Sequence, residues 1–159
     1  MTTVIGIDPG LAATGYGVIR AEGSRIACVD YGVIRTHSSA ATGPRLEEIH
    51  TGVKKLLAEH APDQAGIEGL YFTRNVTSAI PVAQARGVVL LALAQQNVPA
   101  EEYTPQQIKQ AVVGNGQADK EQVMQMVRVI LGMTEVPRPD HAADALAAAI
   151  TRLHAGPGR

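Results

Sequence analysis

The first 35 residues constrain the fold most, because three β-rich runs follow one another with short turns between them. Residues 3–7 and 15–20 flank the turn Asp8-Pro9-Gly10, and a Glu-Gly-Ser turn precedes a third alternating run over residues 25–35. Short turns join antiparallel strands, whereas parallel strands need a longer crossover. The chain is therefore predicted to open with a three-stranded antiparallel meander.

The remainder alternates between helical and extended patterns. After a Ser/Ala/Gly-rich linker over residues 38–44, apolar residues recur at helical spacing until Pro62. Thr104, Asp119 and Asp140 are side chains that favour helix N-caps, so they are expected to begin the last three helices. The predicted elements that follow the meander are a helix, a strand at 64–68, a largely buried helix at 76–96, a strand at 98–103, and helices at 105–113, 119–132 and 141–154. We expect an α/β fold with a five-stranded mixed sheet flanked by helices, forming a single domain over residues 1–159.

Composition limits the class of protein. With 159 residues, of which 45% are hydrophobic, the chain has enough material for one core. We expect no apolar run near the length of a membrane span and no signal peptide, and hence a soluble, cytoplasmic protein. The single cysteine, Cys28, is expected to be a buried structural thiol. The formal net charge of −1 means that any DNA-binding surface must be local.

Two acidic residues end predicted strands. Asp8 follows the first strand, where small neighbours allow a ligand to approach the backbone, and Glu68 ends the apolar run Ala65-Gly66-Ile67. Taken singly, Asp8 could accept backbone hydrogen bonds in a turn, and Glu68 could be a solvated strand end. Ligands of α/β sheets gather beside strand ends, however, so the pair favours a functional site.

A third acid lies at the start of the last predicted helix. His141 and Asp144 are three residues apart and therefore share a helix face, although a solvated face remains an alternative. Asp140 is interpreted as the helix cap. Clustered carboxylates repel one another unless a cation joins them, and oxygen ligands suit Mg²⁺ or Mn²⁺. Two such ions about 4 Å apart can hydrolyse a phosphodiester.

Seven segments together carry a resemblance to a known family over nearly the whole chain: residues 5–10, 14–17, 67–75, 84–87, 107–114, 118–120 and 140–146. These segments resemble the motifs of the RuvC family of Holliday junction resolvases. The resemblance implies a ribonuclease H-like (retroviral-integrase) superfold and a metal-dependent endonuclease. Such an enzyme resolves four-way DNA junctions by paired, symmetric nicks during recombination and repair. It further implies a homodimer that works with the branch-migration proteins RuvA and RuvB.

By the same resemblance, Asp8, Glu68 and Asp144 would ligate metal. His141 stands where many relatives carry a further aspartate, and this replacement removes one negative charge and favours the softer Mn²⁺. The family also implies a set of DNA-binding residues. Tyr71 would stack on an unpaired base, two residues would hold the backbone, and two lysines would lie near the scissile phosphate: Arg74, Asn75, Lys109 and Lys120.

Two alternatives remain open at this stage. The Gly-Ile-Asp-Pro-Gly segment also resembles the phosphate loop of actin-like ATPases and sugar kinases, although those proteins bind nucleotide between two such domains. The chain could also be a non-catalytic module that binds junctions through structural acids. A nuclease assay with and without divalent metal separates this module from an enzyme.

Overall fold

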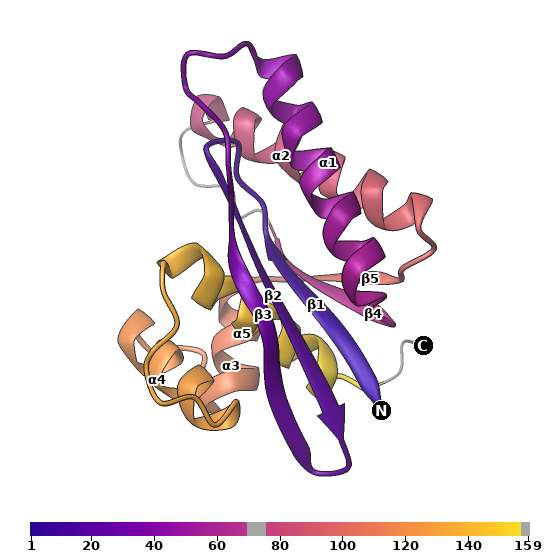
Figure 1. Ribbon diagram of the computed structural model, residues 1–159. Coiled ribbons are helices and arrows are strands. Elements are labelled where there is room, and N and C mark those ends of the chain that lie inside the picture. The colour runs from indigo at the N-terminus through magenta and orange to yellow at the C-terminus, as the bar shows by residue number, and fades with distance from the viewer. Residues whose placement is uncertain (70–75, 157–159) are drawn as a thin grey trace.

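A computed structural model describes residues 1–69 and 76–156 (Figure 1). Within these residues, five strands form one sheet and five helices flank it. In chain order the elements are β1 (Thr2–Asp8), β2 (Ala13–Glu22), β3 (Arg25–Arg35), α1 (Thr42–His60), β4 (Gln64–Glu68), α2 (Val76–Gln95), β5 (Ala100–Tyr103), α3 (Pro105–Val113), α4 (Lys120–Ile130) and α5 (Asp140–His154).

The sheet has the strand order β3-β2-β1-β4-β5. The first three strands pair antiparallel, while β4 runs parallel to β1 and β5 runs parallel to β4. The predicted meander and the mixed five-stranded sheet are therefore confirmed. The two acids that end β1 and β4 consequently lie at the same edge of the sheet.

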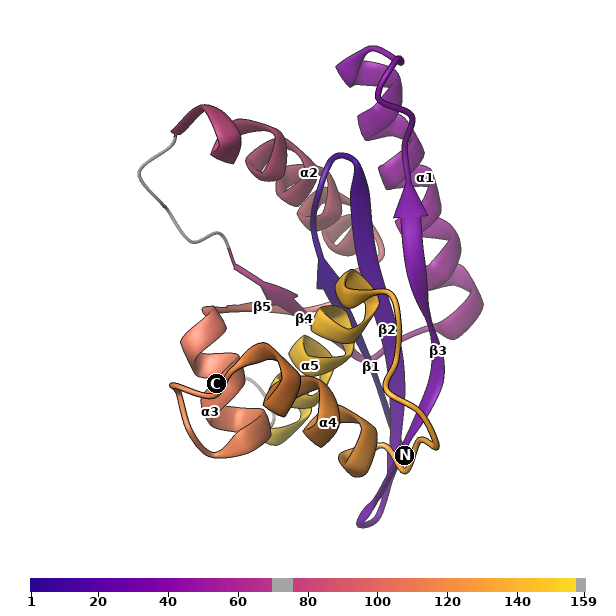
Figure 2. The ribbon, with the colours of Figure 1, turned by 90° about the vertical axis from the view of Figure 1, so that its left-hand side faces the viewer.

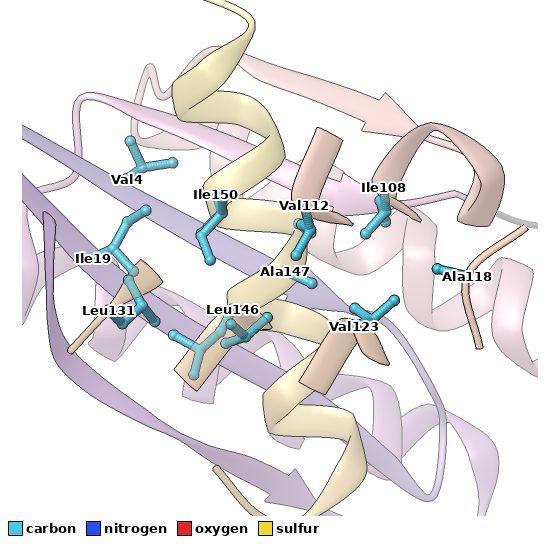
Figure 3. Packing of buried hydrophobic residues seen from close by; sticks show 13 residues of the cluster. Val4, Ile19, Ile108, Val112, Ala118, Val123, Leu131, Leu146, Ala147 and Ile150 are labelled. Atoms are coloured by element: carbon cyan, nitrogen blue, oxygen red, sulfur yellow. The ribbon is translucent and has the colours of Figure 1, made fainter. Parts of the chain in front are cut away.

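Helices cover both faces of this sheet (Figures 1 and 2). On one face, α1 and α2 pack over a core that includes Ile5, Ile7 and Ile67. On the other face, α5 lies directly on β1, β2 and β4, with α3 and α4 packed against α5. Figure 3 shows Leu146 and Ile150 of α5 in the core of this second face.

Strand alternation decides which residues meet α5. Ile5 and Ile7 of β1 point toward α1 and α2, so Gly6 and Asp8 point toward α5. In β4, Gly66 likewise faces α5, and Glu68, two residues later, faces the same side. The period of two therefore places both strand-end acids on the face that α5 covers.

Glycines allow α5 to lie unusually close to the sheet. A Cβ built on Gly6 would overlap the Ala145 carbonyl oxygen and lie 2.7 Å from the Ala149 amide nitrogen. Gly66 meets the Ala148 carbonyl in the same way, and Gly15 of β2 meets the carbonyl of His141. Backbone thus packs against backbone at these positions.

Helix starts agree with the sequence at two of three places. Thr104 and Asp119 each form a capping box: the cap side chain accepts from the amide of the glutamine three positions later, and that glutamine's side chain accepts from the cap residue's amide. The expectation for Asp140 is wrong, because Pro139 occupies the cap position without a side-chain hydrogen bond and Asp140 is the first helical residue. Its carboxylate instead lies 3.4 Å from the Lys120 ammonium.

Element boundaries differ by a few residues. The first helix begins at Thr42, inside the predicted linker, β2 begins at Ala13 and β5 begins at Ala100. Cys28 is only partly buried, yet it packs against the α5-side core and burial raises its thiol pKa to about 11. An unreactive structural thiol agrees with this environment.

The expectation that α2 is largely buried is wrong. One face supplies Ala85, Val89 and Leu93 to the core, but Ile80 is 53% exposed and Leu91 is 51% exposed. The stretch Thr77–Gln95 is also apolar and long enough, by length and composition alone, to cross a membrane. This corrects the expectation that no apolar run approaches that length.

The close contact between β1 and α5 gives a first prediction. Gly6→Ala should destabilise the protein by about 3 kcal/mol or more, because the added methyl overlaps helix backbone that cannot rotate away. Chemical denaturation measures this loss. Gly43→Ala is the matched control, because open space surrounds Gly43 in the first turn of α1. Equal stability of the two variants would contradict the close packing.

Candidate active site

The ends of β1 and β4 bring Asp8 and Glu68 together. The two strands pair in parallel register up to Ile7 and Ile67, so the next residue of each strand is an acid beside its counterpart. The turn after Asp8 is held by Thr14, whose hydroxyl donates to the Gly10 carbonyl at 2.7 Å. The Gly10 amide donates back to the same hydroxyl at 3.2 Å. This turn therefore has a fixed shape.

The first turns of α5 add His141 and Asp144. The Nδ1 atom of His141 lies 2.9 Å from Oδ2 of Asp8. Asp8, His141 and Asp144 each offer one ligand atom, and these atoms all lie within 4.8 Å of one another. Residues from the first strand and the last helix, 133 positions apart, thus form one cluster.

Electrostatics couple Glu68 to this cluster. Burial first, and then repulsion from Asp8 and Asp144, raise the pKa of the Glu68 carboxyl to about 8. Burial and the charge of Asp8 also raise the pKa of Asp144, although Lys120 and His141 oppose that shift. At neutral pH without metal, Glu68 therefore keeps its proton.

One lysine lies beside the acids. The Lys120 ammonium is 3.4 Å from Oδ2 of Asp140 and 3.7 Å from Oδ2 of Asp144, so it links the starts of α4 and α5. The pKa of Lys120 is raised because the attraction of these two carboxylates outweighs the burial that lowers it. Lys120 is therefore a fixed positive charge at the rim of the cluster.

A pocket of about 220 Å³ opens next to the acids. Charged and apolar side chains of α3, α4 and α5 line this pocket, together with one residue of β4. Its lining residues are Glu68, Pro105, Ile108, Lys109, Lys120, Val123, Asp144 and Ala147.

The donor set suits a hard divalent cation. Three carboxylates and one imidazole converge, and oxygen-rich sites of this kind favour Mg²⁺ or Mn²⁺ over softer metals. The raised pKa of Glu68 is a second indication, because burial and then repulsion from Asp8 and Asp144 disfavour its charged form, and a bound cation would offset both effects. The residues present therefore fit a divalent metal.

A second acidic group in the described part of the chain lies elsewhere. Asp30, Glu59 and His60 meet between β3 and the end of α1. The Nε2 atom of His60 already lies 2.9 Å from Oδ2 of Asp30, within hydrogen-bonding distance and away from the strand ends. This group lies outside the cluster around Asp8.

The sequence predicted most of this site. The structure brings Asp8, Glu68, His141 and Asp144 together, and Lys109 and Lys120 line the adjoining pocket. The predicted DNA contacts at Tyr71, Arg74 and Asn75 lie outside the described residues. Sequence reasoning missed the Asp140–Lys120 pair, and it gave no role at the site to the apolar residues that line the pocket: Pro105, Ile108, Val123 and Ala147.

Comparison with known proteins agrees with this geometry. The family model described as "Crossover junction endodeoxyribonuclease RuvC" matches residues 4–152. The protein of that name from Treponema denticola is 56% identical over 153 residues, which cover 96% of this chain and 86% of the relative. Its counterpart from Treponema pallidum is 48% identical over 154 residues, which cover 97% and 79%.

Solved structures give the same result. The chain is similar to Thermus thermophilus RuvC in complex with Holliday junction substrate, with a TM-score of 0.92, 38% identity, and coverage of 96% and 93%. A yeast mitochondrial Holliday junction resolvase shares the fold, with a TM-score of 0.63 at 14% identity. The ribonuclease H-like fold class is confirmed, and the family match over nearly the whole chain replaces the actin-like alternative. The chain belongs to the RuvC family of crossover junction endodeoxyribonucleases.

Proposed function

We propose that this chain is a single-domain, structure-selective endonuclease that resolves four-way DNA junctions by paired, symmetric nicks in recombination and repair. The observation that carries the proposal is the convergence of Asp8, His141 and Asp144, with Glu68 coupled to them, at one edge of the sheet. Relatives with the name crossover junction endodeoxyribonuclease are similar in sequence to this chain over almost its full length.

Asp8, Glu68, His141 and Asp144 would hold two divalent ions, either Mg²⁺ or Mn²⁺. Bound ions of this kind activate a water and stabilise the leaving oxygen in phosphodiester hydrolysis. Glu68 must lose its proton to become a ligand, so metal binding strengthens as the pH rises. A neutral His141 that donates its Nδ1 proton to Asp8 keeps Nε2 as its electron-pair donor.

DNA binding would rely on local positive charge. Lys109 and Lys120 line the pocket beside the acids and would contact the phosphates around the cut. Arg86 of α2 is already engaged within the protein, because its guanidinium forms a bidentate ion pair with Glu102. From the family resemblance, Tyr71 would stack on an unpaired base, while Arg74 and Asn75 would hold the backbone.

Paired nicks need two active sites related by symmetry, so we place a second copy of the chain on the exposed face of α2. Ile80 and Leu91 are large exposed apolar side chains, and Gly87 lies between them on the same helix with open space around it. Such a stripe allows two helices to approach closely. RuvA and RuvB are proposed partners of the resulting homodimer in the cytoplasm.

Loss of a metal ligand should separate cutting from binding. Asp8→Asn and Asp144→Asn should each lower junction cleavage by more than about 100-fold, since even outer-sphere partners of metal ligands are worth ~10- to 100-fold. Junction affinity, measured by gel shift, should stay within about threefold. Glu48→Gln on the exposed part of α1 is the charge-matched control. A parent protein that shifts junctions but never cuts them in Mg²⁺ or Mn²⁺ would be the non-catalytic module.

The raised pKa of Glu68 predicts how stability varies with pH in EDTA. The folded protein keeps this proton up to pH about 8, whereas the unfolded chain loses it near the ordinary value of ~4.3. Between these limits the folded state binds more protons, so stability falls as pH rises.

Glu68→Gln removes this loss because an amide cannot ionise. The variant should be more stable than the parent by about 1–3 kcal/mol at pH 8.5, and equal to it near pH 4, since each pKa unit corresponds to about 1.4 kcal/mol before relaxation. Urea denaturation at the two pH values measures the difference. A variant less stable than the parent at pH 8.5 would contradict the buried, repelled carboxyl.

The dimer is tested by charge on α2. Leu91→Glu should weaken self-association by at least about tenfold, because a charged side chain would replace an apolar one in the proposed interface of both copies. Sedimentation equilibrium measures this, and junction cutting should shift from paired to single nicks. Val129→Glu is the matched control, since Val129 of α4 is 57% exposed. If the parent protein stays monomeric when it is bound to junction DNA, the proposed homodimer is ruled out.

A further inference from the structure

The pocket beside the acids is lined by side chains of two kinds. Glu68, Asp144, Lys109 and Lys120 are charged, and these residues account for metal and phosphate. The apolar wall consists of the lining side chains that neither a metal ion nor a phosphate can use: Pro105, Ile108, Val123 and Ala147. Three of these also pack in the buried core on the α5 side, and the surface that they leave to the pocket suits an apolar group of a ligand.

The size of the pocket limits that ligand. Its volume of about 220 Å³ lies below the ~300–1,000 Å³ of sites for drug-sized molecules, so it holds one ring-sized group. The same pocket is lined by the acids, so its occupant lies next to the reacting phosphate. In a DNA strand, the first ring-containing group next to a phosphate is the adjoining nucleoside.

The strand also has a path onward from this pocket. A second cavity of about 380 Å³ shares Pro105 and Lys109 with the first and continues past polar side chains, including Gln106 and Gln117. Hydrogen bonds fix the loop at its edge, where the Gly116 amide donates to the Gln110 side chain at 3.2 Å. Lys109 therefore stands between two successive subsites, where the next phosphate would lie.

We propose that the pocket between α3 and α4 takes the base that adjoins the scissile phosphate, and that Ile108 and Val123 help to set which base is accepted there. The inference rests on the proposed nuclease function and adds a determinant of cleavage sequence to it. An unstacked base exposes its ring faces, and apolar side chains bind these faces. Contact at the walls then discriminates by size and shape.

Two opposite changes test the pocket. Val123→Leu adds a methylene and narrows it, whereas Ile108→Val removes one and widens it. Cleavage of a junction library with randomised bases around the cut should show a change in base preference of about tenfold at one flanking position, the scale of one methylene in an apolar pocket. Thermal melting checks folding, and Val129→Leu on the exposed side of α4 is the matched control.

A binding measurement supplies a second readout without cutting. In the Asp8→Asn background, 2-aminopurine is placed on either side of the cut in separate junctions. Its fluorescence should rise at one position, because a base in the pocket leaves its stacked neighbours, and Val123→Leu should reduce that rise. Unchanged cleavage preference and unchanged fluorescence in both wall variants, with a parent that cuts normally, would overturn this inference alone. A parent that does not cut with metal would overturn the nuclease function instead.

Discussion

The close packing of α5 on the sheet is the constraint on which the rest of the structure depends. Gly6 and Gly66 offer bare backbone to the helix, and the backbone atoms of Ala145, Ala148 and Ala149 lie against them. Backbone contacts of this kind leave little freedom for the helix to shift. The N-terminal turn of α5 therefore lies at a fixed place beside the ends of β1 and β4.

This packing holds together charges that repel one another. The carboxylates of Asp8, Glu68 and Asp144 would move apart in water. In the folded chain they belong to β1, β4 and α5, and the buried cores on the two faces of the sheet hold these elements in place. The unfavourable charge appears as the raised pKa of Glu68 and Asp144. The fold thus stores a local electrostatic cost that a divalent cation relieves, which explains why a metal suits this edge of the sheet.

Local sequence determined the elements and the identity of the acids. The short β-rich runs at residues 3–7 and 64–68, the helical spacing after Pro44, and the capping boxes at Thr104 and Asp119 all depend on near neighbours. Because the two runs stop at Asp8 and Glu68, the same pattern also assigned these acids to strand ends. The motif resemblance then joined these acids to His141 and Asp144 as one expected site.

Tertiary structure alone decided which surfaces meet. In the folded chain, Asp140 pairs with Lys120 instead of capping the helix. One apolar face of α2 remains exposed. Ile108 and Val123 line the pocket beside the acids. Apolar residues at helical spacing look alike in sequence whether they face a core, a second copy or a ligand. The sequence by itself determined the strands, the helices and the identity of the acids. The burial of each side chain and the distances between the site residues were decided by contacts between segments up to 133 residues apart. Such contacts leave no signal among neighbouring residues of the sequence.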